Sequence, residues 1–291
     1  YNVAIGYESL KSITDGTQLT AIGRHSLTLN TTGTQNTALG YSALYANTSG
    51  TSNTAGGYTA LTSNTTGDNN TAFGRDALYN NNTADGNTAV GHFALRATTA
   101  GGKNTALGYE ALKSNTTGIQ NVAIGYQALD AATVDNNNVA IGHGALTNNN
   151  GGENNVAIGS FALEENTTSN NNTAVGKGAL EANTTGTSNT GCGMQALSRN
   201  TEGNNNSSLG LNSLTYVTTG SNNSAVGVNA GLSNTTGSDN TYFGHDAGYA
   251  ASVNGNSTGS NNSFIGHNAV NTSSSTSNAV TLGDGNISAL R

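Results

Sequence analysis

The stretch from Asn104 to Gly118 reads NTALGYEALKSNTTG, and variants of it follow one another along almost the whole chain. Its glycine, Gly108, recurs every 17 residues from Gly6 to Gly244, and steps of 22 and 17 residues then lead to Gly266 and Gly283. A unit this short cannot enclose a core of its own, so it must bury its apolar atoms against neighbouring copies. The sequence therefore predicts an all-β solenoid, or β-roll, of about 17 coils.

Positions in the unit are counted from this glycine as zero. Asn stands at −4, Thr at −3, Ala at −2 and a large aliphatic residue at −1; a variable residue follows at +1, then Ala at +3, Leu at +4 and Asn-Thr-Thr-Gly at +7 to +10. This spacing does not sustain the 3.6-residue period of a helix. Two strands of about four residues, each followed by a turn, account for the unit. Equivalent strands are expected to pair in parallel and in register, about 4.8 Å apart.

The repeated residues also predict which side chains face inward. Leu occupies +4 in thirteen consecutive coils, from Leu10 to Leu214, and Asn occupies −4 in fifteen of the seventeen. We expect the Asn side chains to form a hydrogen-bonded ladder, and the +4 Leu and −1 aliphatic residues to fill the coil. Alternation along a strand then turns the −2 and +3 alanines outward. Two outward rows of small apolar residues are typical of an interaction surface, which predicts rods packed side by side.

Composition excludes several classes of partner. The 291 residues include 40 Gly, no Pro and no Trp, only 9% are charged, and the net charge is −7. Such a chain offers no basic stripe for nucleic acid, and no apolar run approaches the roughly 20 residues that span a bilayer. We predict neither nucleic-acid binding nor membrane insertion. The single cysteine, Cys192, occupies an aliphatic position and is interpreted as a small buried apolar residue.

No arrangement of residues indicates an enzyme, a cofactor or a metal site. Four of the five histidines occupy the variable +1 position; they are His92, His143, His245 and His267. Three copies of one such histidine could meet at the axis of a trimer and bind a metal, but Tyr, Arg, Lys and Ser take the same position, which favours an ordinary turn residue. The carboxylates Asp76, Glu110 and Glu164 have no acid-base partner nearby in sequence and are expected to be solvated.

Two stretches resemble known families. NVAIG at Asn2–Gly6, Asn121–Gly125 and Asn155–Gly159 resembles the head repeat of YadA-type trimeric autotransporter adhesins. That resemblance implies a left-handed parallel β-roll in which three chains intertwine, although the family's unit is usually near fourteen residues. The stretch from Asn278 to Arg291, NAVTLGDGNISALR, is similar to the segment that precedes the intramolecular chaperone domain of phage tail fibres and tailspikes.

The pattern divides into regular coils at 1–249 and irregular terminal coils at 250–291. In the terminal region five extra residues are expected to form a protruding loop within 250–260. Near it, Gly231 and Gly248 replace the +4 Leu, and Tyr242 and Phe264 replace the −2 Ala, which predicts a wider cross-section or a change of packing.

Together these features predict an extracellular, homotrimeric fibre shaft without enzyme activity, from a phage tail fibre or phage-derived device, that attaches to a host-surface glycan or protein. The alternatives are a bacterial adhesin head, a self-assembling extracellular filament and an ice-binding solenoid.

Overall fold

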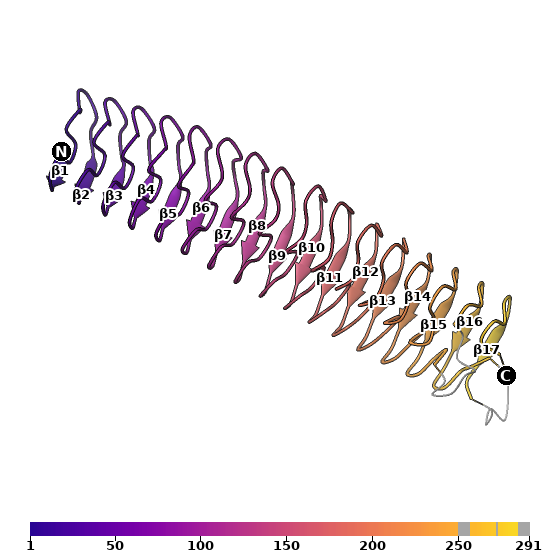
Figure 1. Ribbon diagram of the computed structural model, residues 1–291. Helices are drawn as coiled ribbons and strands as arrows, with labels where there is room; N and C mark the ends of the chain where they lie inside the picture. The colour runs from indigo at the N-terminus through magenta and orange to yellow at the C-terminus, as the bar shows by residue number, and fades with distance from the viewer. Residues whose placement is uncertain (250–256, 272, 285–291) are drawn as a thin grey trace. The chain divides into compact units, whose positions relative to one another are not determined.

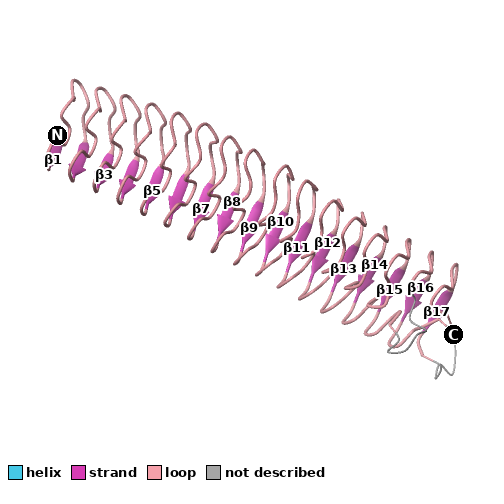
Figure 2. Cartoon of the chain, in the orientation of Figure 1, coloured by secondary structure: helices cyan, strands magenta, loops and turns pink. Residues whose placement is uncertain are grey.

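The computed structural model describes residues 1–249, 257–271 and 273–284, and every regular element among them is a short β-strand (Figures 1 and 2). The chain divides into two compact units, Tyr1–Gly151 and Gly152–Arg291. The strands of the first unit are β1 (Asn2–Ile5), β2 (Leu19–Ile22), β3 (Thr37–Leu39), β4 (Thr54–Gly56), β5 (Thr71–Phe73), β6 (Thr88–Val90), β7 (Thr105–Leu107), β8 (Val122–Ile124) and β9 (Val139–Ile141). Those of the second unit are β10 (Val156–Ile158), β11 (Thr173–Val175), β12 (Thr190–Cys192), β13 (Ser207–Leu209), β14 (Ser224–Val226), β15 (Thr241–Phe243), β16 (Ser263–Ile265) and β17 (Val280–Leu282).

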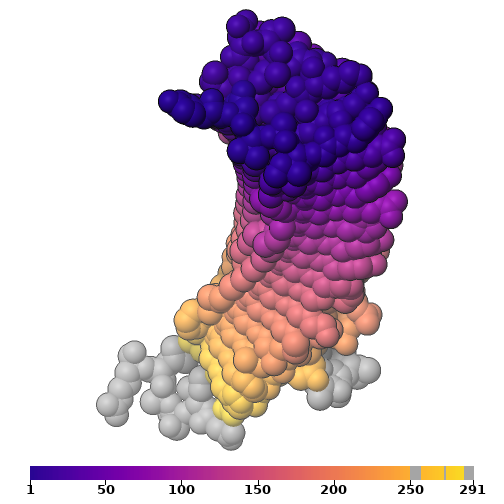
Figure 3. Space-filling model, turned by 90° about the vertical axis from the view of Figure 1, so that its left-hand side faces the viewer, coloured from indigo at the N-terminus to yellow at the C-terminus, as the bar shows by residue number. Residues whose placement is uncertain are grey.

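Within each unit, every strand pairs in parallel with the equivalent strand of the next coil. In the first unit Ala106 of β7 lies opposite Ala123 of β8, and in the second Ala174 of β11 lies opposite Gly191 of β12. Equivalent side chains consequently form rows from coil to coil, visible in the space-filling view (Figure 3). The predicted all-β solenoid with a 17-residue period and in-register parallel pairing is confirmed.

The second predicted strand does not form. Its residues, at +2 to +5, lie in turns, and the backbone at Glu110 and Leu112 has φ of 56° and 52°, in the left-handed region rather than the β region. These turns are nevertheless joined from coil to coil, because the Leu112 amide donates a 3.0 Å hydrogen bond to the carbonyl of Ala128. The backbone groups of this segment are therefore paired without an extended conformation.

The predicted assignment of faces is wrong on the strand. Ala106 at −2 is fully buried, whereas Leu107 at −1 is 46% exposed. Neighbouring side chains on the strand do point to opposite faces, but the alanine points inward and the leucine outward. Leu112 from the turn fills the coil interior, which leaves room for only a methyl group from the strand. Ala111 at +3 is also fully buried, because strand alternation does not apply to a left-handed turn.

The recurring glycine occupies a position that no other residue fits. Gly108 has φ of 137°, in a region that is essentially restricted to glycine. A Cβ atom added to it would lie 2.3 Å from the carbonyl oxygen of Gly125 in the next coil. Backbone conformation and the close approach of successive coils therefore both require glycine here.

Two buried rows of asparagine hold the coils together. At −4, the Asn104 side-chain amide donates to the Gly118 carbonyl, which closes its own coil, and its Oδ1 accepts from the Asn121 backbone amide at 2.9 Å. This confirms the predicted ladder. At +7, the Asn47 amide donates both to the Gly50 carbonyl and to Oδ1 of Asn30 in the preceding coil.

The +7 row is interrupted where another residue replaces Asn, and the interruptions leave buried oxygens unpaired. The side-chain oxygens without a hydrogen-bond partner include those of Asn81, Asn115 and Asn200. In each case the next coil carries a different residue at +7, namely Thr98, Ala132 or Val217. A buried acceptor without a donor costs about 1–3 kcal/mol, so these coils are less stable than an uninterrupted row would be.

Thr98→Asn is expected to stabilise the protein by about 1 kcal/mol. The new amide can donate to the unpaired oxygen of Asn81, and its own oxygen can accept from Asn115, whose amide is now 3.4 Å from the Thr98 hydroxyl. Chemical denaturation would measure the gain. The matched control is Thr99→Asn on the exposed turn, which should change stability by less than about 0.5 kcal/mol. A loss of stability in Thr98→Asn would contradict the prediction.

The large residues near the end of the second unit lie in the core. Tyr242 and Phe264 are fully buried and stack with ring centroids 5.2 Å apart and an interplanar angle of 3°. Tyr242 occupies the space beside Gly231 and Gly248, which replace the +4 leucine in their coils. Tyr242 thus fills interior space that leucine occupies in the regular coils, and the prediction that −2 residues face outward is wrong for Tyr242 and Phe264 too. The predicted loop at 250–260 falls mainly on residues 250–256, outside the described residues.

Candidate interaction surfaces

The outer face of the β-sheet carries a row of exposed apolar side chains at position −1, here called the apolar row. Its half-exposed members in the first unit are Ile5, Ile22, Leu39, Phe73 and Leu107, and those in the second unit are Ile158, Leu209, Val226, Phe243, Ile265 and Leu282. Threonine, serine or valine at −3 lies on the same face. Sequence reasoning missed this surface because it placed the −1 residues inside the coil.

A shallow groove of about 360 Å³ follows the apolar row over β12, β13 and β14. Its lining includes Cys192, Leu209 and Val226 at −1, with Thr190 and Ser207 at −3. Cys192 is partly exposed on this face, so the prediction that it is buried is wrong, for the same reason as for the rest of the row. The groove arises because short −3 side chains lie beside longer −1 side chains.

Aromatic rings form a second row at position +1. Tyr41 and Tyr58 stack with centroids 5.0 Å apart, and Tyr109 stacks on Tyr126 at 5.3 Å, followed by His143 at 5.2 Å. The four tyrosines are each between 40% and 52% exposed. In-register stacking explains this row, since equivalent side chains lie one strand spacing apart.

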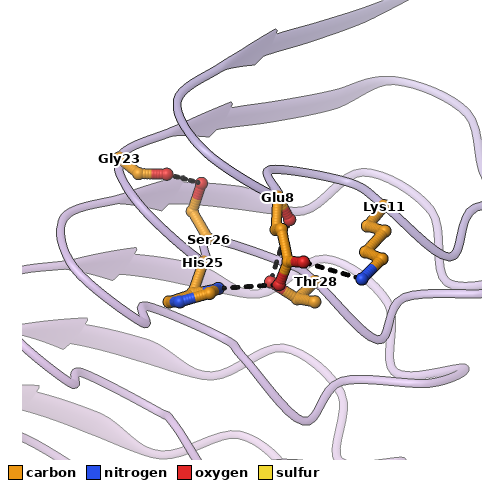
Figure 4. Close-up of polar contacts among 6 residues, drawn as sticks. All are labelled: Glu8, Lys11, Gly23, His25, Ser26 and Thr28. Carbon is orange, nitrogen blue, oxygen red and sulfur yellow. Dashed lines mark hydrogen bonds and ion pairs between the residues drawn. The ribbon is translucent and has the colours of Figure 1, made fainter.

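Charged side chains at +2 and +5 form local contacts within a turn and between successive turns. In Figure 4, Glu8 contacts Lys11 Nζ at 2.7 Å and His25 Nδ1 at 3.3 Å, and its backbone carbonyl accepts a hydrogen bond from Thr28. The hydrogen bond from Lys11 lowers the pKa of Glu8. His25 is the one histidine of the five that does not occupy +1, and it lies at +2.

Two of the carboxylates expected to be solvated are largely covered instead. Asp76 and Glu110 are buried, while Glu164 is half-buried. Glu110 accepts a 2.9 Å hydrogen bond from Gln127 in the next coil and lies 3.1 Å from Lys113 Nζ. These two contacts hold the pKa of Glu110 below its usual value. The stacked coils supply partners that a linear sequence does not reveal.

The +1 histidines are placed in different surroundings. His92 and His143 lie in the aromatic row, whereas His245 and His267 stack on each other beside Asp246. Sequence reasoning placed both histidines at +1 but missed the cluster with Asp246, because the stacking of His245 on His267 is a contact between coils.

No family model matches the chain, and no curated protein matches it either. None of the described residues forms a helix that could cross a membrane.

Proposed function

We propose that the chain is part of the shaft of a homotrimeric extracellular fibre, from a phage tail fibre or a phage-derived device, that supports multivalent attachment to a host surface. The observation that carries the proposal is the apolar row, which recurs in coil after coil of each unit. Soluble monomers rarely leave long contiguous apolar surfaces in water, and such surfaces mark sites of association. Side-by-side packing of identical chains along this row would cover it.

The resemblance to YadA-type head repeats and to tail-fibre stems supports three chains rather than two. In such an assembly the interior of a regular coil is already filled by Leu at +4 and Ala at −2, so the chains meet through residues at −1 and −3. Host-surface glycans or proteins are the proposed partners. Display of three equivalent chains would convert weak contacts with them into avidity.

A bacterial adhesin head and an extracellular filament share this packing and differ in what adjoins the coils. The ice-binding alternative is favoured by the columns of threonine at +8 and +9 and by threonine at −3, half-exposed in β3 to β7. On the same face the −1 position changes from Gly56 to Phe73 in consecutive coils, which does not form the flat array that ice requires. Thermal hysteresis of the purified chain would identify an ice-binding protein.

Leu209→Asp combined with Val226→Asp is expected to convert the oligomer into monomers. Both side chains lie in the groove of the apolar row, and burying two carboxylates per chain between chains without partners is strongly unfavourable. Sedimentation velocity would report the change in mass. The control is Thr185→Asp on an exposed turn, which should leave the oligomer intact. A monomeric wild-type chain would overturn the proposal.

Cys192 provides a second readout of the same packing. As the single cysteine of the chain, it should form disulfide-linked dimers on mild oxidation if equivalent apolar rows meet near a symmetry axis. A Cys192→Ala variant carrying Thr185→Cys is the matched control and should remain largely unlinked. Equal linking of the two variants would argue against packing through the apolar row.

A further inference from the structure

The His245, Asp246 and His267 side chains gather at one place on the second unit. His245 and His267 directly follow Gly244 and Gly266, the glycines after β15 and β16, and these strands pair in register. The two imidazole rings therefore stack, with centroids 5.3 Å apart and an interplanar angle of 22°. The 22-residue step between the glycines does not disturb this alignment.

Asp246 completes the cluster. Its backbone has φ of 56°, the left-handed conformation of every +2 residue around it, and its Oδ2 lies 3.0 Å from Nδ1 of His245. Its other oxygen, Oδ1, accepts a 2.9 Å hydrogen bond from the Asn229 amide in the preceding coil. Outer partners of this kind orient a ligating carboxylate, so one oxygen is held in place while the other faces the histidines.

We propose that His245, His267 and Asp246 form a binding site for a divalent transition-metal ion of the Zn²⁺ class. One ligand atom from each of the three residues lies within 4.8 Å of the others. Two imidazoles and one carboxylate are a donor set that suits zinc and its neighbours, rather than calcium or magnesium, which prefer oxygen ligands alone.

The exposure of the ligands determines what kind of site this is. The side chain of His245 is 53% exposed and that of Asp246 is 18% exposed, so rotation of the rings can draw the donor atoms to within about 2.0–2.2 Å of a metal without moving the backbone. Three protein ligands leave a coordination position for water or for a side chain of another molecule. All three ligands come from one chain, so the site does not depend on the proposed trimer.

The same solenoid contains matched comparison sites. His92 and His143 occupy the same +1 position, but Phe93 and Gly144 follow them where Asp246 follows His245. In the described part of the chain, no second group of three histidine, cysteine or acidic side chains lies as close together. Metal binding at His245 but not at His92 or His143 would therefore distinguish a specific site from the general affinity of surface histidines for metal ions.

Calorimetric titration of the tag-free chain with Zn²⁺ would test the proposal. We expect one ion per chain, and a loss of affinity of at least about tenfold in each of His245→Asn, His267→Asn and Asp246→Asn. His143→Asn is the control and should bind as the wild type does. Circular dichroism without metal should be unchanged in all four variants, since these side chains lie at the surface.

Co²⁺ provides an independent spectroscopic readout, because its visible absorption reports nitrogen and oxygen coordination. The expected result is a visible absorption band that saturates at one equivalent in the wild type and is lost in the His245→Asn/His267→Asn double variant. The proposal is overturned if the wild type shows no saturable binding, if the double variant binds equally well, or if His143→Asn loses as much affinity. Sedimentation of the metal-free protein reports on the trimer separately.

Discussion

Gly108→Ala is expected to lower the free energy of unfolding by at least about 3 kcal/mol. The alanine would have to adopt φ near 137°, and its Cβ would lie 2.3 Å from the Gly125 carbonyl oxygen and 2.8 Å from the carbonyl carbon. Backbone atoms of a stacked coil cannot move away without breaking the parallel pairing of β7 with β8. Denaturant titration followed by circular dichroism would measure the loss.

A second glycine provides the control for this substitution. Gly86 also has positive φ, at 70°, but an added Cβ would meet nothing closer than Lys103 Cγ at 3.7 Å. Asn69 takes the equivalent place one coil earlier with φ of 57°, and asparagine tolerates this conformation. Gly86→Asn should therefore change stability by less than about 0.5 kcal/mol. A Gly108→Ala protein as stable as Gly86→Asn would refute the proposed role of the glycine row.

Gly248→Leu alone is expected to destabilise the second unit by about 3 kcal/mol. The double variant Gly248→Leu/Tyr242→Ala should be destabilised far less than that, relative to the wild type. The Cβ of the new leucine would lie 2.3 Å from Cδ1 and Cε1 of Tyr242. Tyr242→Ala alone should cost about 3–5 kcal/mol, because it empties the space that the ring fills. Together the two changes restore the usual alanine at −2 and leucine at +4.

The double variant should accordingly be more stable than either single variant, with a coupling energy of about 2 kcal/mol or more. Thermal and chemical unfolding of all four proteins would measure it. Gly248→Leu combined with Leu163→Ala, which alters a buried leucine several coils away, is the control and should be additive within about 0.5 kcal/mol. Additive losses in the Tyr242 pair would show that the two residues do not share one space.

The sequence predicts the period, parallel pairing, register and −4 asparagine ladder correctly. Each of these follows from spacing alone: Gly108, Asn104 and their equivalents recur every 17 residues, and only an in-register stack satisfies them all at once. The second row of asparagine could have been recognised in the same way, because Asn47 and Asn64 repeat with the same spacing.

The orientation of the strand could not be predicted in this way. Spacing indicates that Ala106 and Leu107 face opposite sides, but not which side is the interior. That choice depends on Leu112, which enters the coil from a left-handed turn rather than from a strand. Bulky residues seldom adopt the left-handed conformation, so the backbone preference of leucine did not predict it at Leu112. The hydrogen bond from Gln127 to Glu110 and the stacking of His245 on His267 were missed because they are contacts between coils.

The row of glycine has an evolutionary consequence. Since the backbone pairing of a regular coil is repeated one period later, removal or duplication of exactly one period would bring equivalent backbone groups together again. A gain or loss of one residue in β7, by contrast, would bring a Cβ atom against the Gly125 carbonyl. Gene duplication can thus lengthen or shorten either unit in fixed increments of one coil.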